Sequence, residues 1–248
     1  MDCANRATET EIAPQATEIA ENPACNIMGN SVSRDHAVPG RHVCSSDWSL
    51  FAASGRRKYL TRAELLRVLA AFDALPSERR LFALTLAWTG ARVSEILALT
   101  PSAFDLDSGL VAIRTLKRRR FAMREVPLPR MLVQELADAF DLAARQQDAA
   151  RAEARLWRFG RTTAWRMVTC AMAQASISGR PATPRGLRHG FGVGALQAGV
   201  PVTLVQRWLG HARLSTTAIY ADVSGPEERA MVERYWRWSS ENMRGVQG

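Results

Sequence analysis

The chain has 248 residues, enough for one or two domains with a sizeable core, and its 33 basic and 24 acidic side chains leave a formal net charge of +9. This excess points to a polyanionic partner, most simply nucleic acid. No stretch is long and apolar enough to span a membrane, and no signal-peptide pattern opens the chain, so the composition argues against a membrane-spanning or exported protein.

The four cysteines indicate neither a metal site nor a disulfide framework. Cys3, Cys25, Cys44 and Cys170 show no CxxC pairing and no metal-ligand spacing. We therefore expect reduced thiols, a cytoplasmic location, no metal site and no cofactor.

Residues 1–58 differ from the rest of the chain. Asparagine, serine, threonine, alanine, proline and glycine are scattered through them without a helical or strand period, and their charges nearly balance. We expect a flexible or disordered N-terminal leader there. The folded region, with all of the excess positive charge, is expected to begin at residue 59.

Three helices are predicted early in the folded region. The first begins with a capping box formed by Thr61 and Glu64, ahead of an apolar run. Helical periodicity then continues between breaks at glycine and proline. The expected helices cover residues 61–72, 78–88 and 93–99.

The pattern changes to that of strands between residues 109 and 129. Residues 110–114 and 125–128 are typical of the two strands of an antiparallel β-hairpin. Its tip carries Lys117, one of two lysines in the chain, followed by three arginines. Arginine stays charged at any accessible pH whereas lysine can release a proton, so Lys117 is distinctive within a basic turn.

Helical patterns return after the hairpin, with a polar connection expected over residues 146–153. The expected helices cover residues 131–144, 162–177, 187–197, 202–209 and 215–220, and a last one starts at residue 225. The sequence thus predicts a mainly α fold with a small antiparallel β-hairpin or sheet.

A tyrosine late in the chain is close in sequence to basic residues. Tyr220 follows His211 by nine residues, and Arg188 and His189 form a second basic cluster upstream. Nearby cations favour the anionic form of a phenol and balance the charge of a phosphate. The pattern is therefore suited to attack by Tyr220 on a phosphodiester.

These motifs, in this order, resemble those of the tyrosine recombinases, also called phage-type integrases. The resemblance runs from about residue 59 to about residue 236. It is carried by residues 89–97 with Arg92, Lys117 in the hairpin, residues 187–189 with Arg188, and residues 209–211 with Tyr220 nine positions after His211. It implies the catalytic-domain fold of DNA breaking-rejoining enzymes over residues 59–240, including a C-terminal helix, and a flexible tail at 241–248.

The resemblance also implies a function. It is that of a site-specific DNA recombinase or integrase, which breaks and rejoins strands through a 3′-phosphotyrosyl intermediate without metal or ATP. The partner would be double-stranded DNA at a specific recombination site in the bacterial cytosol or nucleoid, with no membrane. The protein would act on DNA as a homodimer or tetramer, alone or with a partner recombinase or accessory protein.

Each matching residue has a role that phosphoryl chemistry explains. Arg92 and Arg188 would clamp the non-bridging oxygens, because the planar guanidinium can donate two hydrogen bonds at once. Lys117 would protonate the leaving 5′-oxygen, and His211 would bind a phosphate oxygen. Tyr220 would be the nucleophile.

Two features depart from the family's usual pattern. Arg185 occupies the place of the first histidine in the His-x-x-Arg box, and arginine cannot act as a general base. Arg185 is instead expected to bind phosphate or to lower the pKa of Tyr220. Residues 1–58 are also too short and irregular for the core-binding domain that most members carry.

Other residues receive more ordinary interpretations. His189 is expected to be a buried, hydrogen-bonded packing residue, and Glu95 to order a neighbouring arginine or backbone amide. Contacts to DNA are expected from the arginines in and around the hairpin, which are Arg114, Arg118, Arg119, Arg120 and Arg124. Two other functions remain open: a catalytically degenerate DNA-binding or regulatory homologue, and a type IB topoisomerase-like enzyme.

Overall fold

The computed structural model describes residues 49–116, 122–220, 229 and 232–233. These residues belong to the second of two compact units of the chain, Ala37–Gly248. Among them, no helix is long and apolar enough to cross a membrane. The predicted leader up to residue 48, the hairpin tip, most of the last helix and the tail at 241–248 lie outside the described residues.

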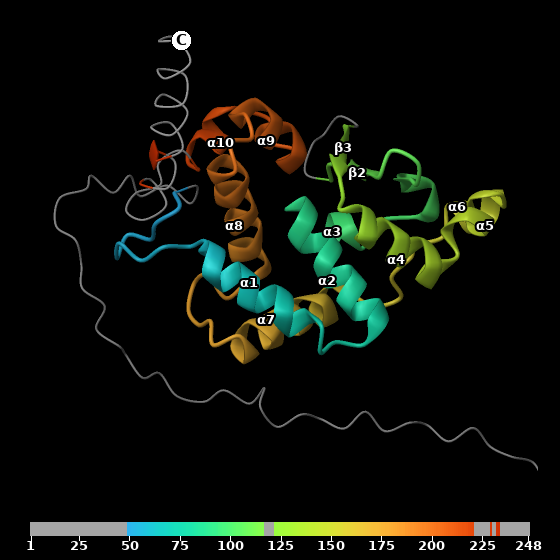
Figure 1. Cartoon of the computed structure of the whole chain (residues 1–248), viewed down its shortest axis with the longest axis horizontal. Helices are drawn as coiled ribbons and strands as arrows, with labels where there is room; N and C mark the ends of the chain where they lie inside the picture. The colour runs from blue at the N-terminus through green and yellow to red at the C-terminus, as the bar shows by residue number, and fades with distance from the viewer. Residues whose placement is uncertain (1–48, 117–121, 221–228, 230–231, 234–248) are drawn as a thin grey trace, which may run out of the picture. The chain divides into compact units, whose positions relative to one another are not determined.

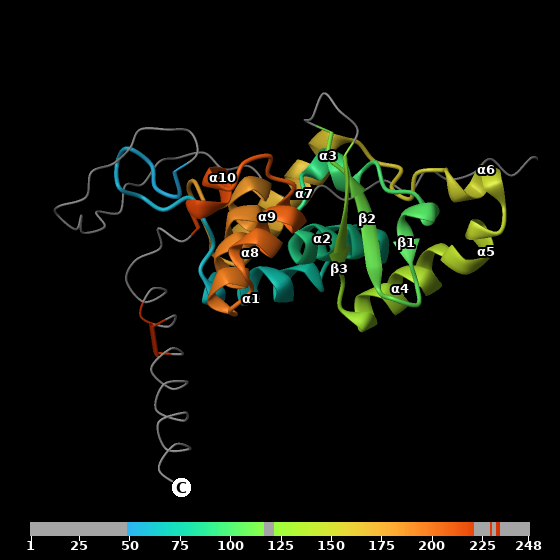
Figure 2. The same ribbon diagram turned by 90° about the horizontal axis from the view of Figure 1, so that it is seen from above.

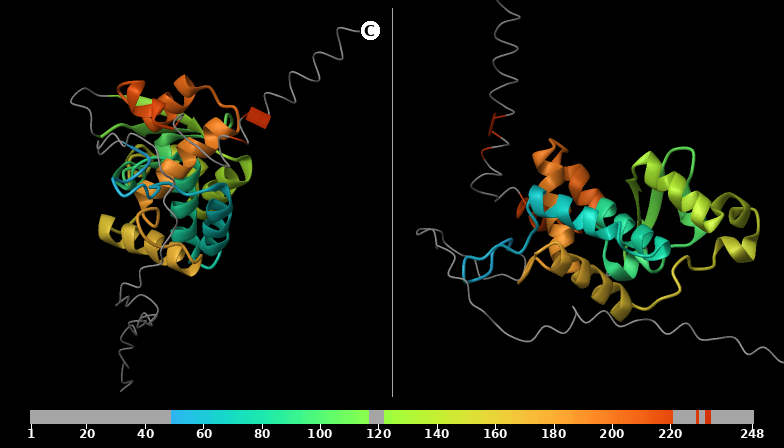
Figure 3. Two further views of the ribbon diagram at one scale, coloured as in Figure 1. Left: turned by 90° about the vertical axis from the view of Figure 1, so that its left-hand side faces the viewer. Right: turned by 60° about the horizontal axis from the view of Figure 1, so that its bottom comes forward.

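The described fold is mainly helical with one small antiparallel sheet, which confirms the predicted fold class. Helices α9 and α10 lie at one end of α8 (Figure 1), and α1 and α7 run side by side (Figure 3). The elements in chain order are α1 (Arg62–Phe72), α2 (Ser77–Thr89), α3 (Val93–Ile96), the 3₁₀ turn η2 (Pro101–Ala103), β1 (Phe104–Asp105), β2 (Leu110–Arg114), β3 (Met123–Pro127), α4 (Arg130–Phe140), α5 (Leu142–Gln146), α6 (Ala149–Ala152), α7 (Arg161–Gln174), α8 (Pro184–Gln197), α9 (Val202–Leu209) and α10 (Ser215–Ala218).

The sequence signals at the helix ends explain where several helices begin and stop. The predicted capping box is present, because the Thr61 hydroxyl accepts from the backbone of Glu64 while the Glu64 carboxylate accepts from the backbone of Thr61. Helices α2 and α9 end at Gly90 and Gly210, both in the left-handed conformation. The carbonyl groups at these two ends belong to the candidate site described below.

The sheet has strand order β1-β2-β3, with one strand more than the predicted hairpin (Figure 2). Strand β1 has two residues, too few to give a period in the sequence. Val111 pairs with Val126 and Ile113 pairs with Arg124 across β2 and β3. These four side chains are buried, so the side chain of Arg124 occupies a core-facing position of the sheet.

Two predicted boundaries are wrong for local reasons. The helix expected over residues 131–144 is divided into α4 and α5 at Asp141, whose φ of 49° is left-handed. The connection expected over 146–153 contains α6, because the Asp148 carboxylate accepts from two backbone amides and caps a short helix. Both differences depend on an aspartate whose backbone conformation the periodicity does not reveal.

The folded region begins earlier than residue 59. Leu50 is 2% exposed and packs in a second hydrophobic cluster with Tyr59, Val193 and Tyr220, next to the main core. An antiparallel bridge joins Phe51 to Arg57 within the same segment. Residues 49–58 therefore form part of the fold beside the candidate nucleophile.

Cys170, on α7, is disulfide-bonded. The expectation that all four thiols are reduced is therefore wrong for this residue. The spacing of cysteines along the chain does not report such a bond, because a disulfide depends on proximity in space.

Candidate functional site

Four residues predicted to act on a phosphate converge beside helix α8. Arg188 lies on α8, Arg92 immediately precedes α3, and His211 and Tyr220 follow α9 and α10. The charges of both arginines act on both His211 and Tyr220. The two rings stack, with centroids 6.1 Å apart and planes inclined by 12°. Segments far apart in the sequence thus form one cluster, as the motifs predict.

The guanidinium of Arg188 is held by the ends of two helices. Nη1 donates to the carbonyl of Gly90 and Nη2 to the carbonyl of Leu209, each at 2.7 Å. Helix C-terminal carbonyls favour a cation there. The residue is 8% exposed, and no carboxylate among the described residues forms an ion pair with it. Burial and the charge of Arg92 lower its pKa to about 10, so Arg188 remains charged at neutral pH.

Arg92 is oriented by Glu95. The backbone N–H of Arg92 donates to one carboxylate oxygen at 3.0 Å, and Nη1 donates to the other at 2.8 Å. Burial raises the pKa of Glu95, but the charge of Arg124 and the bonds from both arginines outweigh it, so the pKa is lowered. The side chain of Arg92 is 24% exposed. The prediction that Glu95 orders an arginine is confirmed, and Arg92 remains accessible to a ligand.

His211 follows the end of α9 and is held by a hydroxyl group. Its Nδ1 lies 2.9 Å from Oγ1 of Thr217. Burial, followed by the charges of Arg188 and Arg92, lowers the pKa of His211 to about 3, so the ring is neutral in the free protein. Within the described ranges, no group of three His, Cys, Asp or Glu side chains could hold a metal ion.

Tyr220 is buried, with 1% of its surface exposed. Its ring lies against the backbone of Gly192, where an added Cβ would come within 2.8 Å of two ring carbons. A residue larger than glycine would therefore displace the ring or the helix. Burial raises the pKa of the phenol, although the charges of Arg188, Arg185 and Arg92 oppose this effect. Tyr220 is thus protonated in the free protein.

His189 was expected to pack in the core, and it is indeed buried, but its partner is the candidate nucleophile. Its Nδ1 lies 3.1 Å from the hydroxyl oxygen of Tyr220. Burial and the charges of Arg185, Arg188 and Lys58 lower the pKa of His189 to about 3. A sequence signal existed, because residues four apart on a helix share a face and His189 follows Arg185 by four.

Arg185 lies exposed in the first turn of α8. Its charge lowers the pKa of Tyr220 and of His189, although burial dominates at both groups. Arg185 is therefore exposed and still close enough to act electrostatically on the cluster.

The predicted DNA-contacting arginines differ in their positions, and Arg124 is taken separately below. Arg118, Arg119 and Arg120 lie outside the described residues, as does Lys117. Arg114 is exposed at the end of β2.

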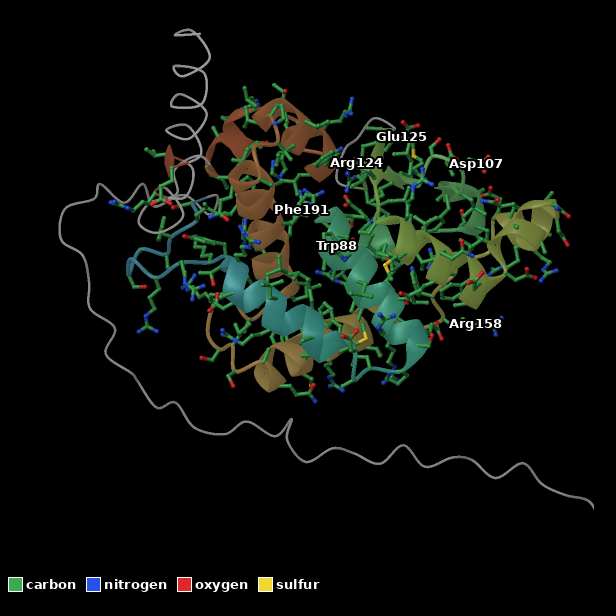
Figure 4. The ribbon with its side chains drawn as sticks, in the orientation of Figure 1. Trp88, Asp107, Arg124, Glu125, Arg158 and Phe191 are labelled. Carbon is green, nitrogen blue, oxygen red and sulfur yellow. The ribbon has the colours of Figure 1, made fainter. Side chains whose placement is uncertain are left out.

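Arg124 requires a correction, because it is buried, with 5% of its surface exposed. It lies on β3 (Figure 4). Its Nη2 donates to Glu95 at 2.6 Å, Nη1 to Thr115 at 2.9 Å and Nε to the carbonyl of Trp208 at 2.6 Å. The guanidinium is occupied by these partners and joins β3 to α3 and α9. It is a structural group and not a surface contact for DNA.

Comparisons with known proteins identify the family of this chain. Residues 58–226 match the sequence model of the phage integrase family. The chain is 32% identical over 177 residues to the tyrosine recombinase XerA of Thermococcus kodakarensis, covering 71% of this chain and 62% of that protein. It is 35% identical over 144 residues to XerD of Mycobacterium tuberculosis, covering 55% of this chain and 45% of that protein.

Solved structures show the same fold. A crystal structure of XerA recombinase matches with a TM-score of 0.58 at 28% identity, covering 71% of this chain and 64% of that one. The catalytic domain of bacteriophage HP1 integrase matches with a TM-score of 0.51 at 22% identity, covering 71% and 93%. The chain spans about three-fifths of the length of the XerA relative. Because the family match extends over most of the sequence, the chain belongs to the phage integrase family.

Proposed function

We propose that this chain is a site-specific DNA recombinase or integrase that breaks and rejoins strands through a 3′-phosphotyrosyl bond to Tyr220, without metal or ATP. The observation that carries the proposal is the buried guanidinium of Arg188. It donates to two backbone carbonyls and forms no ion pair with any described side chain. A buried cation is costly unless an anion binds beside it. A DNA phosphodiester next to Tyr220 is such an anion.

Attack by Tyr220 on phosphorus produces a pentavalent species with negative charge on its non-bridging oxygens. Arg92 and Arg188 are the donors for these oxygens, since both act electrostatically on Tyr220. His211 supplies a further hydrogen bond to the phosphate. Each well-placed oxyanion donor contributes about 3–4 kcal/mol to the stability of a transition state.

Lys117 is the proposed acid for the leaving 5′-oxygen, because it lies in the connection between β2 and β3. Arg124 anchors β3 to Glu95 and to the carbonyl of Trp208, which fixes one strand of that connection relative to Arg92. Arg114, Arg118, Arg119 and Arg120 contact the DNA backbone in this proposal. Arg185 contributes charge at the edge of the cluster.

The free protein keeps its nucleophile covered. Tyr220 is 1% exposed, and His211 is also buried. DNA binding must therefore uncover the hydroxyl of Tyr220 before attack. We propose that this occurs on double-stranded DNA at a specific site, in a homodimer or tetramer.

A covalent capture assay tests the function without knowledge of the target. The protein is incubated with a library of nicked duplexes of randomised sequence, and adducts that survive denaturation are isolated and sequenced. We expect a consensus site and a phosphotyrosine bond, both lost in Tyr220→Phe. Salt-sensitive DNA binding without any adduct would instead identify a degenerate binding protein. Relaxation of supercoiled plasmid without recombinant products would identify a topoisomerase.

A further inference from the structure

The hydroxyl group of Tyr220 has a specific buried partner that the family's usual catalytic roles do not include. Nδ1 of His189 lies 3.1 Å from the phenolic oxygen, within hydrogen-bond distance. We infer that His189 accepts the phenolic proton of Tyr220 as the phosphotyrosyl bond forms, in the role that Arg185 cannot perform. This inference rests on the proposed function and assigns a further catalytic residue to it.

The geometry keeps this contact free from competition by water. Tyr220 is 1% exposed and His189 is 6% exposed. The ring of Tyr220 is held against the backbone of Gly192, one turn after His189 on the same helix. Because both side chains are confined in this way, the contact is already at hydrogen-bond distance before DNA uncovers the hydroxyl of Tyr220.

The other candidate groups are less suited to accept the proton. Arg185 and Arg188 are cations without a lone pair to offer. The ring of His211 stacks nearly parallel to that of Tyr220, and its Nδ1 is bound to Thr217. A stacked ring presents its face, and its nitrogens lie in the plane and point outward. His189 is the group whose nitrogen meets the hydroxyl.

The tautomer of His189 is decided by Tyr220. Nε2 is buried and has no hydrogen-bond partner within the described part of the chain. The contact between Nδ1 and the phenol is therefore the bond that selects where the ring carries its hydrogen. If the phenol donates, Nδ1 has a free lone pair and Nε2 carries the hydrogen.

The surrounding charges explain why the proton would move only when DNA is bound. Arg185, Arg188 and Lys58 all oppose a positive charge on His189. A phosphodiester beside Arg188 brings negative charge that offsets this field and makes the imidazolium less unfavourable. Tyr220 would then remain an unreactive phenol until a substrate arrives.

The reaction balances with this assignment. The Tyr220 oxygen forms a bond to phosphorus as its proton passes to Nδ1 of His189. The bond from phosphorus to the 5′-oxygen breaks, and that oxygen takes a proton from Lys117. When a 5′-hydroxyl attacks the intermediate, both transfers run in reverse and His189 returns the proton to the departing phenol.

The first test examines the free protein by ¹⁵N NMR of its histidine side chains. The signals of His189 are assigned by their loss in His189→Asn. We expect nitrogen shifts of the tautomer with hydrogen on Nε2 and a lone pair on Nδ1. Hydrogen on Nδ1 would overturn the inference. The NMR measurement uses the free protein, so its result does not depend on DNA cleavage.

The second test measures the rate of adduct formation on the site recovered by covalent capture. Asparagine places an amide near the position of Nδ1, so His189→Asn keeps a hydrogen-bonding group but cannot take the proton. We expect its rate to fall at least about 10²-fold. Incorporation of 3,5-difluorotyrosine at position 220, which lowers the phenol pKa, should recover most of this loss. Thermal unfolding of each variant confirms that it is folded.

Lys117→Ala provides the matched contrast. A substrate with sulfur in place of the 5′-bridging oxygen has a leaving group that needs no acid. With this substrate, the rate of adduct formation should recover in Lys117→Ala and stay low in His189→Asn. Recovery of His189→Asn by the sulfur substrate, no recovery by fluorinated tyrosine, or a rate equal to wild type would each overturn the role of His189. If the wild-type protein forms no adduct at all, the proposed function fails and the inference fails with it.

Discussion

Two buried arginines, in neighbouring regions of the molecule, are held in opposite ways. On β3, Arg124 forms an ion pair with the buried carboxylate of Glu95 and donates to two further oxygens. On α8, Arg188 donates to two backbone carbonyls and forms no ion pair among the described residues. Both side chains are less than a tenth exposed, so burial does not distinguish them.

The difference lies in the counter-charge. Where the carboxylate is built in, as at Arg124, the guanidinium is satisfied and serves as an internal brace. Where it is missing, as at Arg188, the positive charge stays available and its orientation is already set by the helix ends. A buried cation with neutral acceptors therefore indicates an anion site better than a basic sequence run does.

Of the variants considered, Arg124→Met should lower the free energy of unfolding the most. This change leaves Glu95 buried with one of its two arginines missing, and we expect a loss of about 3–5 kcal/mol in the free energy of unfolding. Urea unfolding measures it. Arg130→Met, at an exposed arginine three residues after β3, is the control and should remain within about 0.5 kcal/mol of wild type. Equal losses in the two variants would show that Arg124 is not a brace.

Arg188→Met should give the opposite profile. It removes a phosphate donor, and we expect adduct formation to fall about 10²–10³-fold. It leaves no carboxylate unpaired, only carbonyls, so the stability loss should be about 1–3 kcal/mol and smaller than in Arg124→Met. Rates and urea unfolding are measured on the same preparations. A larger stability loss than in Arg124→Met would contradict the distinction between the two arginines.

Acid should affect the region of Arg188 first. His189 and His211 have folded-state pKa values of about 3, below the unfolded value of about 6.5. The unfolded chain therefore binds protons first, so the stability that these residues contribute is complete above pH 6.5 and is lost as the pH falls towards 3. The slope is about 1.4 kcal/mol per pH unit for each histidine.

The acid effect is measured by urea unfolding between about pH 6.5 and 5.5, above the range in which the carboxylates of the unfolded chain take up protons. His189→Asn should lower the slope by the contribution of one proton. An unchanged slope in this variant would mean that His189 is not buried as a neutral group.

The sequence was informative wherever a local rule determined the structure. The capping box of Thr61 and Glu64, the glycine stops and the order of the basic motifs predicted most helices and four of the clustered site residues. These features depend on nearest neighbours along the chain or on chemistry that requires particular residue types.

The positions that the sequence did not predict are set by which face of a strand a residue occupies and by contacts between distant segments. Arg124 was grouped with surface arginines, although strand alternation places it on the same face as Val126, opposite Ile113. His189 is buried, as predicted, but the sequence alone did not indicate that its partner is Tyr220, which follows it by 31 residues. The burial of Tyr220 against Leu50 and Gly192 arises from tertiary contacts that no local pattern contains.

The carboxylate of Glu95 is shared between Arg92, the proposed phosphate ligand, and Arg124, which braces β3. A phosphate that draws Arg92 away from Glu95 would strengthen the ion pair between Glu95 and Arg124, because one cation fewer would share the carboxylate. Linkage requires this coupling to be reciprocal, so the state of β3 must also change the affinity of Arg92 for an anion. In the proposed mechanism, anion binding at Arg92 and the position of β3 are thus coupled through Glu95.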